Sequence, residues 1–240
     1  MFKLNQLINN YKLREILKNN LQKFRLGRRL WQISRATLNL RNRSFRQIFF
    51  EVNSNDICID LGANIGYASL VMWLKGSKKI YAIEPNIEAF KVLEKNLENI
   101  KNISTLNIAI SSETKEEKLY LHKNLKSKSD IEKVVELSQA SSLLSNKTNL
   151  GNEFFKVKAK SLIDFLDDLK TKPTIIKCDI EGGEYIIFKQ LVECAKSYNI
   201  RKIFVECHAK KYPQYQKLHE EFMKLIKENK LENVIDTSWH

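Results

Sequence analysis

The sequence lacks most features that would place it outside the globular class. Only 7 of its 240 residues are glycine and 3 are proline, which leaves little room for linkers or low-complexity tracts. Its longest uncharged apolar run, residues 65–74, is about half of the ~20 residues that a transmembrane helix needs. Polar and charged side chains interrupt residues 1–17, so we expect no signal peptide. These features predict a cytoplasmic protein with a core of ordinary size.

The cysteines are few and isolated from one another. Cys58, Cys178, Cys194 and Cys207 form no C-x-x-C pair, and three of them lie inside apolar runs. An isolated cysteine in a core behaves as a small hydrophobic residue. We therefore expect buried, reduced thiols without a metal or redox role.

Positive charge is concentrated at the N-terminus. The chain carries 41 Lys and Arg against 28 Asp and Glu, a formal net charge of +13. Residues 1–50 hold twelve of these basic residues and one acidic residue, Glu15, so the rest of the chain is nearly neutral. We therefore divide the chain into a basic extension, residues 1–50, and a domain, residues 51–240.

Apolar residues of the extension recur at helical spacing, which predicts two amphipathic helices. We expect the first to end at Gly27 and the second to lie within residues 30–50. Their apolar faces could pack on the domain, which we favour, or their basic faces could contact an anionic membrane or glycolipid. Nucleic-acid binding is a third interpretation, but no nucleic-acid motif supports it, so we expect no such partner.

From Asp56 onward, short apolar runs alternate with helical stretches, which is typical of β-α units and a parallel sheet. We expect strands at residues 57–61, 80–84, 103–110, 118–121, 154–159, 174–179 and 202–207. We expect helices at residues 65–74, 87–97, 184–195 and 215–228. The predicted fold class is α/β, with helices on both faces of the sheet.

A glycine-rich turn, residues 60–66 (DLGANIG), joins the first predicted strand to the first helix. Glycine lets the chain turn tightly and lets a ligand approach the backbone, and the helix beyond offers free N–H groups. The dinucleotide fingerprint G-x-G-x-x-G needs glycine where this chain has Asn64 and Tyr67. We therefore expect no NAD binding and no dehydrogenase activity.

Two acidic residues end the first two predicted strands. Glu84 lies where a carboxylate can accept both hydroxyls of a ribose. Asp60 can meet a cationic group of a ligand, such as the α-amino group of S-adenosylmethionine. Together with the turn, these carboxylates favour a nucleoside cofactor.

Five segments resemble the FkbM-type methyltransferases: DLGANIG (60–66), EPN (84–86), SLIDF (161–165), KCDIEGGE (177–184) and FVECH (204–208). The combination of the turn with a D-x-E-G-x-E motif about 120 residues later is specific, and the resemblance covers about residues 51–208. It implies S-adenosylmethionine as cofactor and a Rossmann-like, seven-stranded methyltransferase sheet. It also implies methylation of hydroxyls, often of sugars in glycans or secondary metabolites.

The resemblance places a set of residues on the cofactor: Asp60, Gly62, Asn64, Gly66 and Glu84. Ala109 follows the third predicted strand, where this fold class usually meets adenine. The chain departs from the family after its last predicted helix, where few residues remain. We therefore expect the final hairpin of the family to be short or altered.

Methyl transfer from a sulfonium is a direct displacement, so the enzyme must chiefly align the reacting atoms while a base takes the hydroxyl proton. The reaction is expected beyond the C-terminal ends of the strands, where Asp179, Glu181 and His208 fall. Neighbouring carboxylates raise one another's pKa, which suits a base near neutral pH, and the imidazole of His208 has an ordinary pKa of about 6.5. We predict these three residues as catalytic.

Two further acidic residues near this edge receive other interpretations. Glu184 is predicted to cap a helix N-terminus, where the helix dipole stabilises a negative charge. Glu206 could join Asp179, Glu181 and His208 around a divalent ion, but strand alternation does not show that Asp179 faces the other side chains. We therefore predict no metal.

These observations predict an S-adenosylmethionine-dependent O-methyltransferase acting on a hydroxyl of a saccharide, glycolipid or related glycan precursor. The alternative is a non-catalytic protein that binds an anionic membrane or glycolipid surface through its basic extension. Peripheral contact with the inner face of the membrane is compatible with both. The identity of the acceptor and the oligomeric state stay open.

Overall fold

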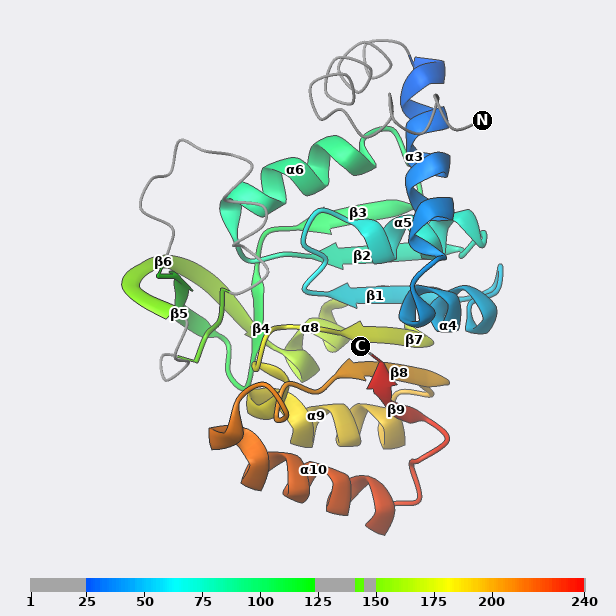
Figure 1. The fold of residues 1–240 in the computed structure, drawn as a ribbon. Helices are drawn as coiled ribbons and strands as arrows, with labels where there is room; N and C mark the ends of the chain where they lie inside the picture. The colour runs from blue at the N-terminus through cyan, green and yellow to red at the C-terminus, as the bar shows by residue number, and fades with distance from the viewer. Residues whose placement is uncertain (1–24, 124–140, 145–149, 240) are drawn as a thin grey trace, which may run out of the picture.

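The computed structural model describes residues 25–123, 141–144 and 150–239 (Figure 1). Its helices are α3 (Arg25–Asn39), α4 (Arg43–Glu51), α5 (Tyr67–Leu74), α6 (Ile87–Leu97), α8 (Leu162–Asp168), α9 (Glu184–Ser197), the 3-10 helix η1 (Pro213–Tyr215) and α10 (Gln216–Glu228). Its strands are β1 (Ile57–Leu61), β2 (Lys79–Ile83), β3 (Ile103–Leu106), β4 (Ala109–Ser111), β5 (Lys115–His122), β6 (Leu150–Ser161), β7 (Ile175–Cys178), β8 (Lys202–Glu206) and β9 (Ile235–Trp239). Within these ranges, no helix combines the length and apolar character needed to cross a bilayer.

Six strands form the central sheet in the order β3-β2-β1-β7-β8-β9, and every neighbouring pair is parallel. Parallel strands need long crossover connections, which the helices between them provide. The predicted α/β class is confirmed, but the seventh strand is not, since six strands form this sheet in the described part. The order places β1 and β7 side by side at its centre, so the segments that follow them meet.

The predicted strand at residues 103–110 is wrong, because the segment forms two strands in different sheets. β3 ends at Leu106 and pairs with β2, whereas β4 begins at Ala109 and pairs with β6. At the break, the side-chain amide of Asn107 donates to the carbonyl oxygens of Glu84 (2.8 Å) and Pro85 (3.1 Å). The apolar pattern continues across the break, so periodicity alone could not locate it.

The second sheet has the order β4-β6-β5, with β5 antiparallel to β6. Figure 1 shows β5 and β6 on the side toward which the arrowheads of β1, β2 and β7 point. Residues 141–144 lie against β5 through a bridge between Ser142 and Tyr120. This sheet therefore extends over the carboxyl edge of the central sheet.

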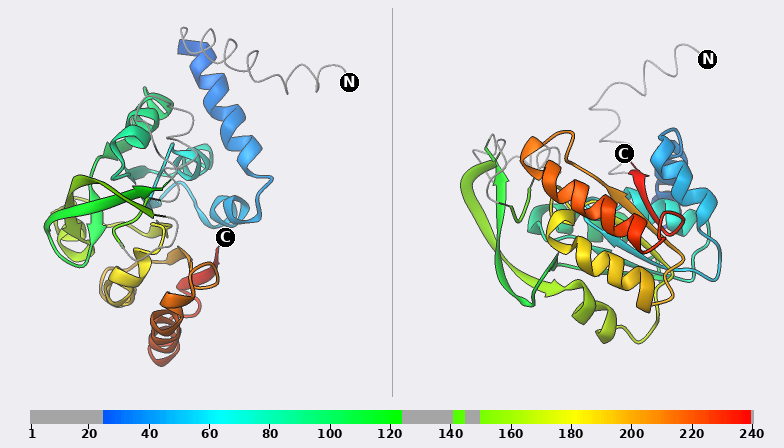
Figure 2. Two further views of the ribbon diagram at one scale, coloured as in Figure 1. Left: turned by 60° about the vertical axis from the view of Figure 1, so that its left-hand side comes forward. Right: turned by 90° about the horizontal axis from the view of Figure 1, so that it is seen from below.

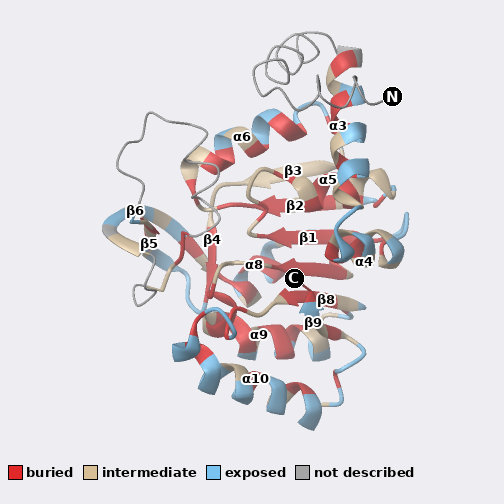
Figure 3. Ribbon diagram, in the orientation of Figure 1, coloured by how far each residue is buried: buried red, intermediate tan, exposed pale blue. Residues whose placement is uncertain are grey.

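Helices cover both faces of the central sheet, in a three-layer arrangement (Figure 2). Ile59 and its neighbours face α8, α9 and α10, whereas Cys58 faces α4 and α5. Side chains alternate between the faces of a strand, which explains this division along β1. Figure 3 shows the central strands mostly buried and the outer sides of α3, α6 and α10 exposed.

Helix α3 contains Gly27, so the prediction that a helix ends at this glycine is wrong. Trp31 and Ala36 are buried in a cluster with residues of α5 and α6, and the buried Gln32 side chain donates to the Asn96 carbonyl at 2.9 Å. This packing stabilises the helix through the position where glycine propensity favours an end. The first predicted amphipathic helix lies largely outside the described residues.

Candidate functional site

A cavity of about 590 Å³ opens at the carboxyl ends of β1, β2, β7 and β8. This size lies within the ordinary range of small-molecule sites. Of the predicted site residues, the cavity is lined by Gly62, Asn64, Glu84, Ala109, Asp179, Glu181 and His208. Residues 141–143, part of the polar segment 122–153 that was expected to border the acceptor cleft, also line the cavity, and α4 contributes a wall that the sequence did not predict.

The glycine-rich turn is tied to the end of β2 through Glu84. This carboxylate is only 7% exposed, and its two oxygens accept the backbone N–H groups of Asn64 and Asn86, each at 2.9 Å. Burial raises the pKa of Glu84 to about 7, although these two hydrogen bonds lower it in part. Each carboxylate oxygen has a second acceptor position, so Glu84 can still accept hydroxyl donors from a ligand.

Gly62 brings the turn against the loop that follows β7. It has a φ of +69°, and a Cβ at this position would lie 1.8 Å from the carbonyl oxygen of Asp179. Only glycine fits so close to another backbone in this left-handed conformation. The glycine-rich turn and the D-x-E-G-x-E motif are therefore in direct contact, although 116 residues lie between Gly62 and Asp179.

Lys177 is a site residue that the sequence analysis did not identify. Its side chain is 4% exposed, and its Nζ lies 3.1 Å from Asp60 Oδ1 and 3.7 Å from Asp179 Oδ2. The same Nζ donates to the Gly62 carbonyl at 2.8 Å. Burial lowers the pKa of Lys177, but the charges of Asp60 and Asp179 outweigh this and leave it raised. The ammonium group therefore stays charged and joins β1, β7 and the turn.

Asp60 and Gly66 do not line the cavity. Asp60 is fully buried, and besides its pairing with Lys177 it accepts the Ser69 hydroxyl at 2.6 Å. Gly66 caps α5 with a φ of +95°, and a Cβ there would lie 2.9 Å from a methyl group of Leu93. Asp60 and Gly66 therefore fix the position of the turn from outside the cavity.

His208 is held by Glu184, a contact that the sequence analysis also missed. The Nδ1 of His208 lies 2.9 Å from Glu184 Oε1, and both side chains are buried. Glu184 also accepts the backbone N–H of Gly182 at 2.8 Å, as expected for an acidic residue at a helix N-terminus. It thus lies in the first turn of α9, whose N-cap is Gly183, and orients the imidazole.

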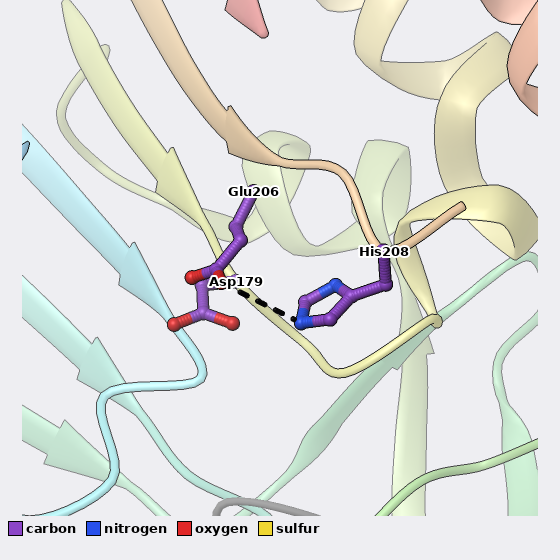
Figure 4. Close-up of side chains that lie close together, drawn as sticks. All are labelled: Asp179, Glu206 and His208. Carbon is purple, nitrogen blue, oxygen red and sulfur yellow. Dashed lines mark ion pairs between the residues drawn. The ribbon is translucent and has the colours of Figure 1, made fainter. Parts of the chain in front are cut away.

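Carboxylates gather around the other ring nitrogen of His208 (Figure 4). Its Nε2 lies 3.6 Å from Glu181 and 3.8 Å from Glu206. Burial would lower the pKa of His208, but Glu184, Glu181 and Asp179 outweigh it and raise the pKa to about 9. Burial and the nearby charge of Asp179 raise the pKa of Glu206 to about 7. The cluster is thus anionic around one imidazolium.

The contacts that the sequence missed share one cause. Lys177 lies in the KCDIEGGE segment (177–184), but its sequence position predicted no contact with Asp60. Glu184 was predicted only to cap a helix N-terminus. The partner of Lys177, Asp60, lies on β1, and the partner of Glu184, His208, follows β8; both strands neighbour β7. This strand order cannot be derived from one sequence alone. A lysine inside an otherwise apolar strand was the signal that could have identified a buried ion pair.

A parallel α/β sheet with a glycine-rich turn and a buried carboxylate at its carboxyl edge places the protein in the Rossmann-like class. The sequence model of the methyltransferase FkbM domain matches residues 60–231, and the chain belongs to this family. Methyltransferases of this family use S-adenosylmethionine, so the predictions of family, enzyme class and cofactor are confirmed. No curated protein matches the chain in sequence.

Several solved methyltransferase structures are similar to this chain at low sequence identity. Precorrin-6y C5,15-methyltransferase from Geobacter metallireducens GS-15 is 11% identical with a TM-score of 0.42, over 78% of this chain and 68% of that one. P. horikoshii TYW2 in complex with MeSAdo is 13% identical with a TM-score of 0.37, over 78% and 50%. M. jannaschii TYW2 in complex with AdoMet is 14% identical with a TM-score of 0.37, over 78% and 64%.

Proposed function

We propose that this methyltransferase transfers the methyl group to a hydroxyl of a saccharide, glycolipid or related glycan precursor. The observation that carries this proposal is the composition of the cavity beyond the turn, where Asp179, Glu181, Glu206 and His208 converge. A hydroxyl-rich acceptor brings many hydrogen-bond donors, and carboxylates accept them. The resemblance to FkbM-type enzymes supports the same class of acceptor.

The residues of the turn fit the cofactor in this proposal. Glu84 accepts the ribose hydroxyls, and Gly62 and Asn64 present backbone to the ligand without a large side chain. Ala109 leaves room for adenine at the cavity wall. Asp60 and Gly66 act indirectly by fixing the turn. When bound, S-adenosylmethionine supplies an electrophilic methyl group.

On the acceptor side, Asp179, Glu181 and His208 hold the acceptor hydroxyl, and one of the two carboxylates takes its proton as the oxygen attacks the methyl group, because the imidazolium of His208 has no free lone pair to accept it. Glu184 fixes the His208 ring, so the imidazole keeps one orientation while the acceptor enters. The protein needs little further chemistry, because a displacement at a methyl group depends chiefly on alignment. The contact between Gly62 and Asp179 supports such alignment by joining the two sides of the cavity.

The test is methyl transfer from labelled S-adenosylmethionine to a panel of saccharides, glycolipids, phenols and amines. We expect label on the saccharide or glycolipid hydroxyls. Asp179→Asn should lose transfer while S-adenosylhomocysteine still binds, and Glu116→Gln, an exposed acid on β5, should keep both. Labelling of amines alone, or full activity of Asp179→Asn, contradicts the proposal.

We also propose that α3 contacts an anionic membrane surface while the domain carries out catalysis. Helix α3 contains four arginines and no acidic residue, and Leu30, Ile33 and Leu38 are exposed on it. Basic residues beside exposed apolar side chains are typical of helices that lie on anionic lipid. Since the family assignment establishes an enzyme, this contact accompanies catalysis and does not replace it.

Sedimentation with vesicles tests the membrane contact. The protein should bind vesicles rich in anionic phospholipid and dissociate from them at high salt, and it should not bind neutral vesicles. Replacing Leu30, Ile33 and Leu38 by serine should abolish binding, whereas serine at the exposed α10 residues Leu218 and Met223 should not. Absence of binding by the unaltered protein, or equal binding by both variants, contradicts this contact.

A further inference from the structure

We propose that Asp179, Glu206 and His208 form a binding site for a divalent metal ion at the acceptor side of the cavity. One carboxylate oxygen from each acid and one ring nitrogen of His208 all lie within 4.8 Å of one another. Figure 4 shows the three side chains converging from the ends of two neighbouring strands, β7 and β8. The sequence left their mutual placement open, and the structure brings them together.

The imidazole of His208 is arranged as a metal-binding histidine is. Its side chain is 4% exposed, and Nδ1 is bound to the fully buried carboxylate of Glu184 at 2.9 Å. Metal-bound histidines almost always donate their other ring nitrogen to a carboxylate or carbonyl in this way. Within the described part of the chain, Nε2 makes no hydrogen bond and points into the cluster, with carboxylate oxygens 3.6 Å and 3.8 Å away.

The charges of the cluster also favour a cation. Three carboxylates, those of Asp179, Glu181 and Glu206, surround one imidazole nitrogen. Lys177 contributes a positive charge 3.7 Å from Asp179, but it lies closer to Asp60, which it also neutralises. Lys211 Nζ lies 4.0 Å from Glu181, so the two lysines offset part of this negative charge, and a divalent ion would take the place of the proton on His208 Nε2.

The donor set selects the kind of ion. Two carboxylates suit Mg²⁺ and Mn²⁺, and an imidazole extends the choice to borderline transition metals. Cys207, the nearest thiol in the sequence, is not part of the set, so a soft ion has no preferred ligand here. A site with three protein ligands retains open positions for water or for an acceptor hydroxyl. We therefore expect Mn²⁺ and Mg²⁺ to bind.

Such an ion would hold the acceptor oxygen beside the turn that carries the cofactor. This role rests on the proposed O-methyl transfer, whereas the binding of the ion does not. Gly62 contacts the backbone of Asp179, so the ion site and the cofactor side of the cavity are fixed relative to each other. Binding can therefore be tested without an acceptor and without turnover.

The experiment is a titration of the purified full chain with Mn²⁺, followed by the electron paramagnetic resonance signal of the free ion. We expect one ion per chain, displaced by excess Mg²⁺. His208→Gln and Glu206→Gln should weaken Mn²⁺ binding at least tenfold, and Glu184→Gln, which alters the carboxylate that orients His208, should weaken it by about 10- to 100-fold. Glu116→Gln serves as the control and should bind as the unaltered protein does.

Binding of S-adenosylhomocysteine shows that each variant is folded. Failure of the unaltered protein to bind Mn²⁺ at millimolar concentration overturns the site, and so does unchanged binding by folded His208→Gln and Glu206→Gln. Specific Mn²⁺ binding without methylation of any hydroxyl acceptor would leave the ion site standing and contradict the proposed function alone. Hydroxyl methylation that is unaffected by chelators, in a protein that binds no Mn²⁺, would overturn the ion site and leave the proposed function standing.

Discussion

Glu84 is predicted to make cofactor affinity depend on pH near neutrality. Burial raises its pKa to about 7, so in the ligand-free protein the carboxyl group is about half protonated at that pH. Its two oxygens already accept N–H groups from Asn64 and Asn86, and ribose hydroxyls need acceptors as well. A proton on Glu84 removes an acceptor position, so the ionised form is the one that binds the cofactor.

The size of the effect follows from this pKa. Below about pH 7, each pH unit lowers the fraction of ionised Glu84 about tenfold, so the dissociation constant of S-adenosylhomocysteine should rise about tenfold from pH 8 to pH 6. This change equals ~1.4 kcal/mol. The stability of the ligand-free fold changes with pH in the opposite direction, because the pKa of Glu84 in the folded state lies above the ordinary glutamate pKa of 4.5. The group stabilises the fold below about pH 4.5, and ~3 kcal/mol of this contribution is lost as the pH rises through about 7.

Calorimetric titration at pH 6, 7 and 8 measures the affinity. Glu84→Gln should bind S-adenosylhomocysteine more weakly, by ~1–3 kcal/mol for the altered buried acceptor, and with little dependence on pH. Glu88→Gln, at the first turn of α6 and paired with Lys91, is the matched control and should follow the unaltered protein. A tenfold pH dependence that persists in Glu84→Gln, or its absence in the unaltered protein, refutes the reasoning.

Two further predictions concern the stability of the site, measured by urea denaturation. Gly62→Ala should lower the free energy of unfolding by several kcal/mol, because the new Cβ would meet the backbone of Asp179. The control Gly76→Ala should cost only the ~1–2 kcal/mol of a left-handed conformation, since nothing lies within 4 Å of the new Cβ. Equal losses in the two variants would argue against the contact. Lys177→Met should cost ~3–5 kcal/mol by leaving Asp60 buried without its partner. Adding Asp60→Asn to Lys177→Met should recover part of that loss. If the loss of unfolding free energy in the double variant equals the sum of the losses in the two single variants, the pairing is contradicted.

Patterns within one segment predicted four strands of the central sheet, β1, β2, β7 and β8, to within one residue at each end. The observed bounds of β1 and α6 are those expected, since turn residues flank β1 and Asn86 caps α6 through hydrogen bonds to Glu88 and Ala89. Local signals failed where packing decides the outcome. Helix α3 continues through Gly27 because its apolar side is buried, and β9 (IDTSW) lacks the apolar run by which the other strands were recognised.

The order of elements along the chain predicted which edge of the sheet holds the site, but not which side chains touch one another there. Carboxyl ends of parallel strands share one edge, so the sequence could place Glu84, Asp179 and His208 at the same end of the sheet. Which side chains touch depends on strand order and loop conformation. The pairing of Lys177 with Asp60 needs β7 beside β1, and the contact of His208 with Glu184 needs β8 beside β7.

The contact between the two family motifs explains how the protein meets the main demand of methyl transfer. A displacement requires the acceptor oxygen, the methyl carbon and the sulfur to be aligned, and small misplacements are costly. Here Gly62 touches the backbone of Asp179, and Lys177 binds Gly62 and lies between the carboxylates of Asp60 and Asp179. The turn that we propose to carry the cofactor and the acids that we propose to face the acceptor therefore belong to one packed unit. Alignment in this protein depends on that packing, and a change at Gly62 should disturb the acceptor side as much as the cofactor side.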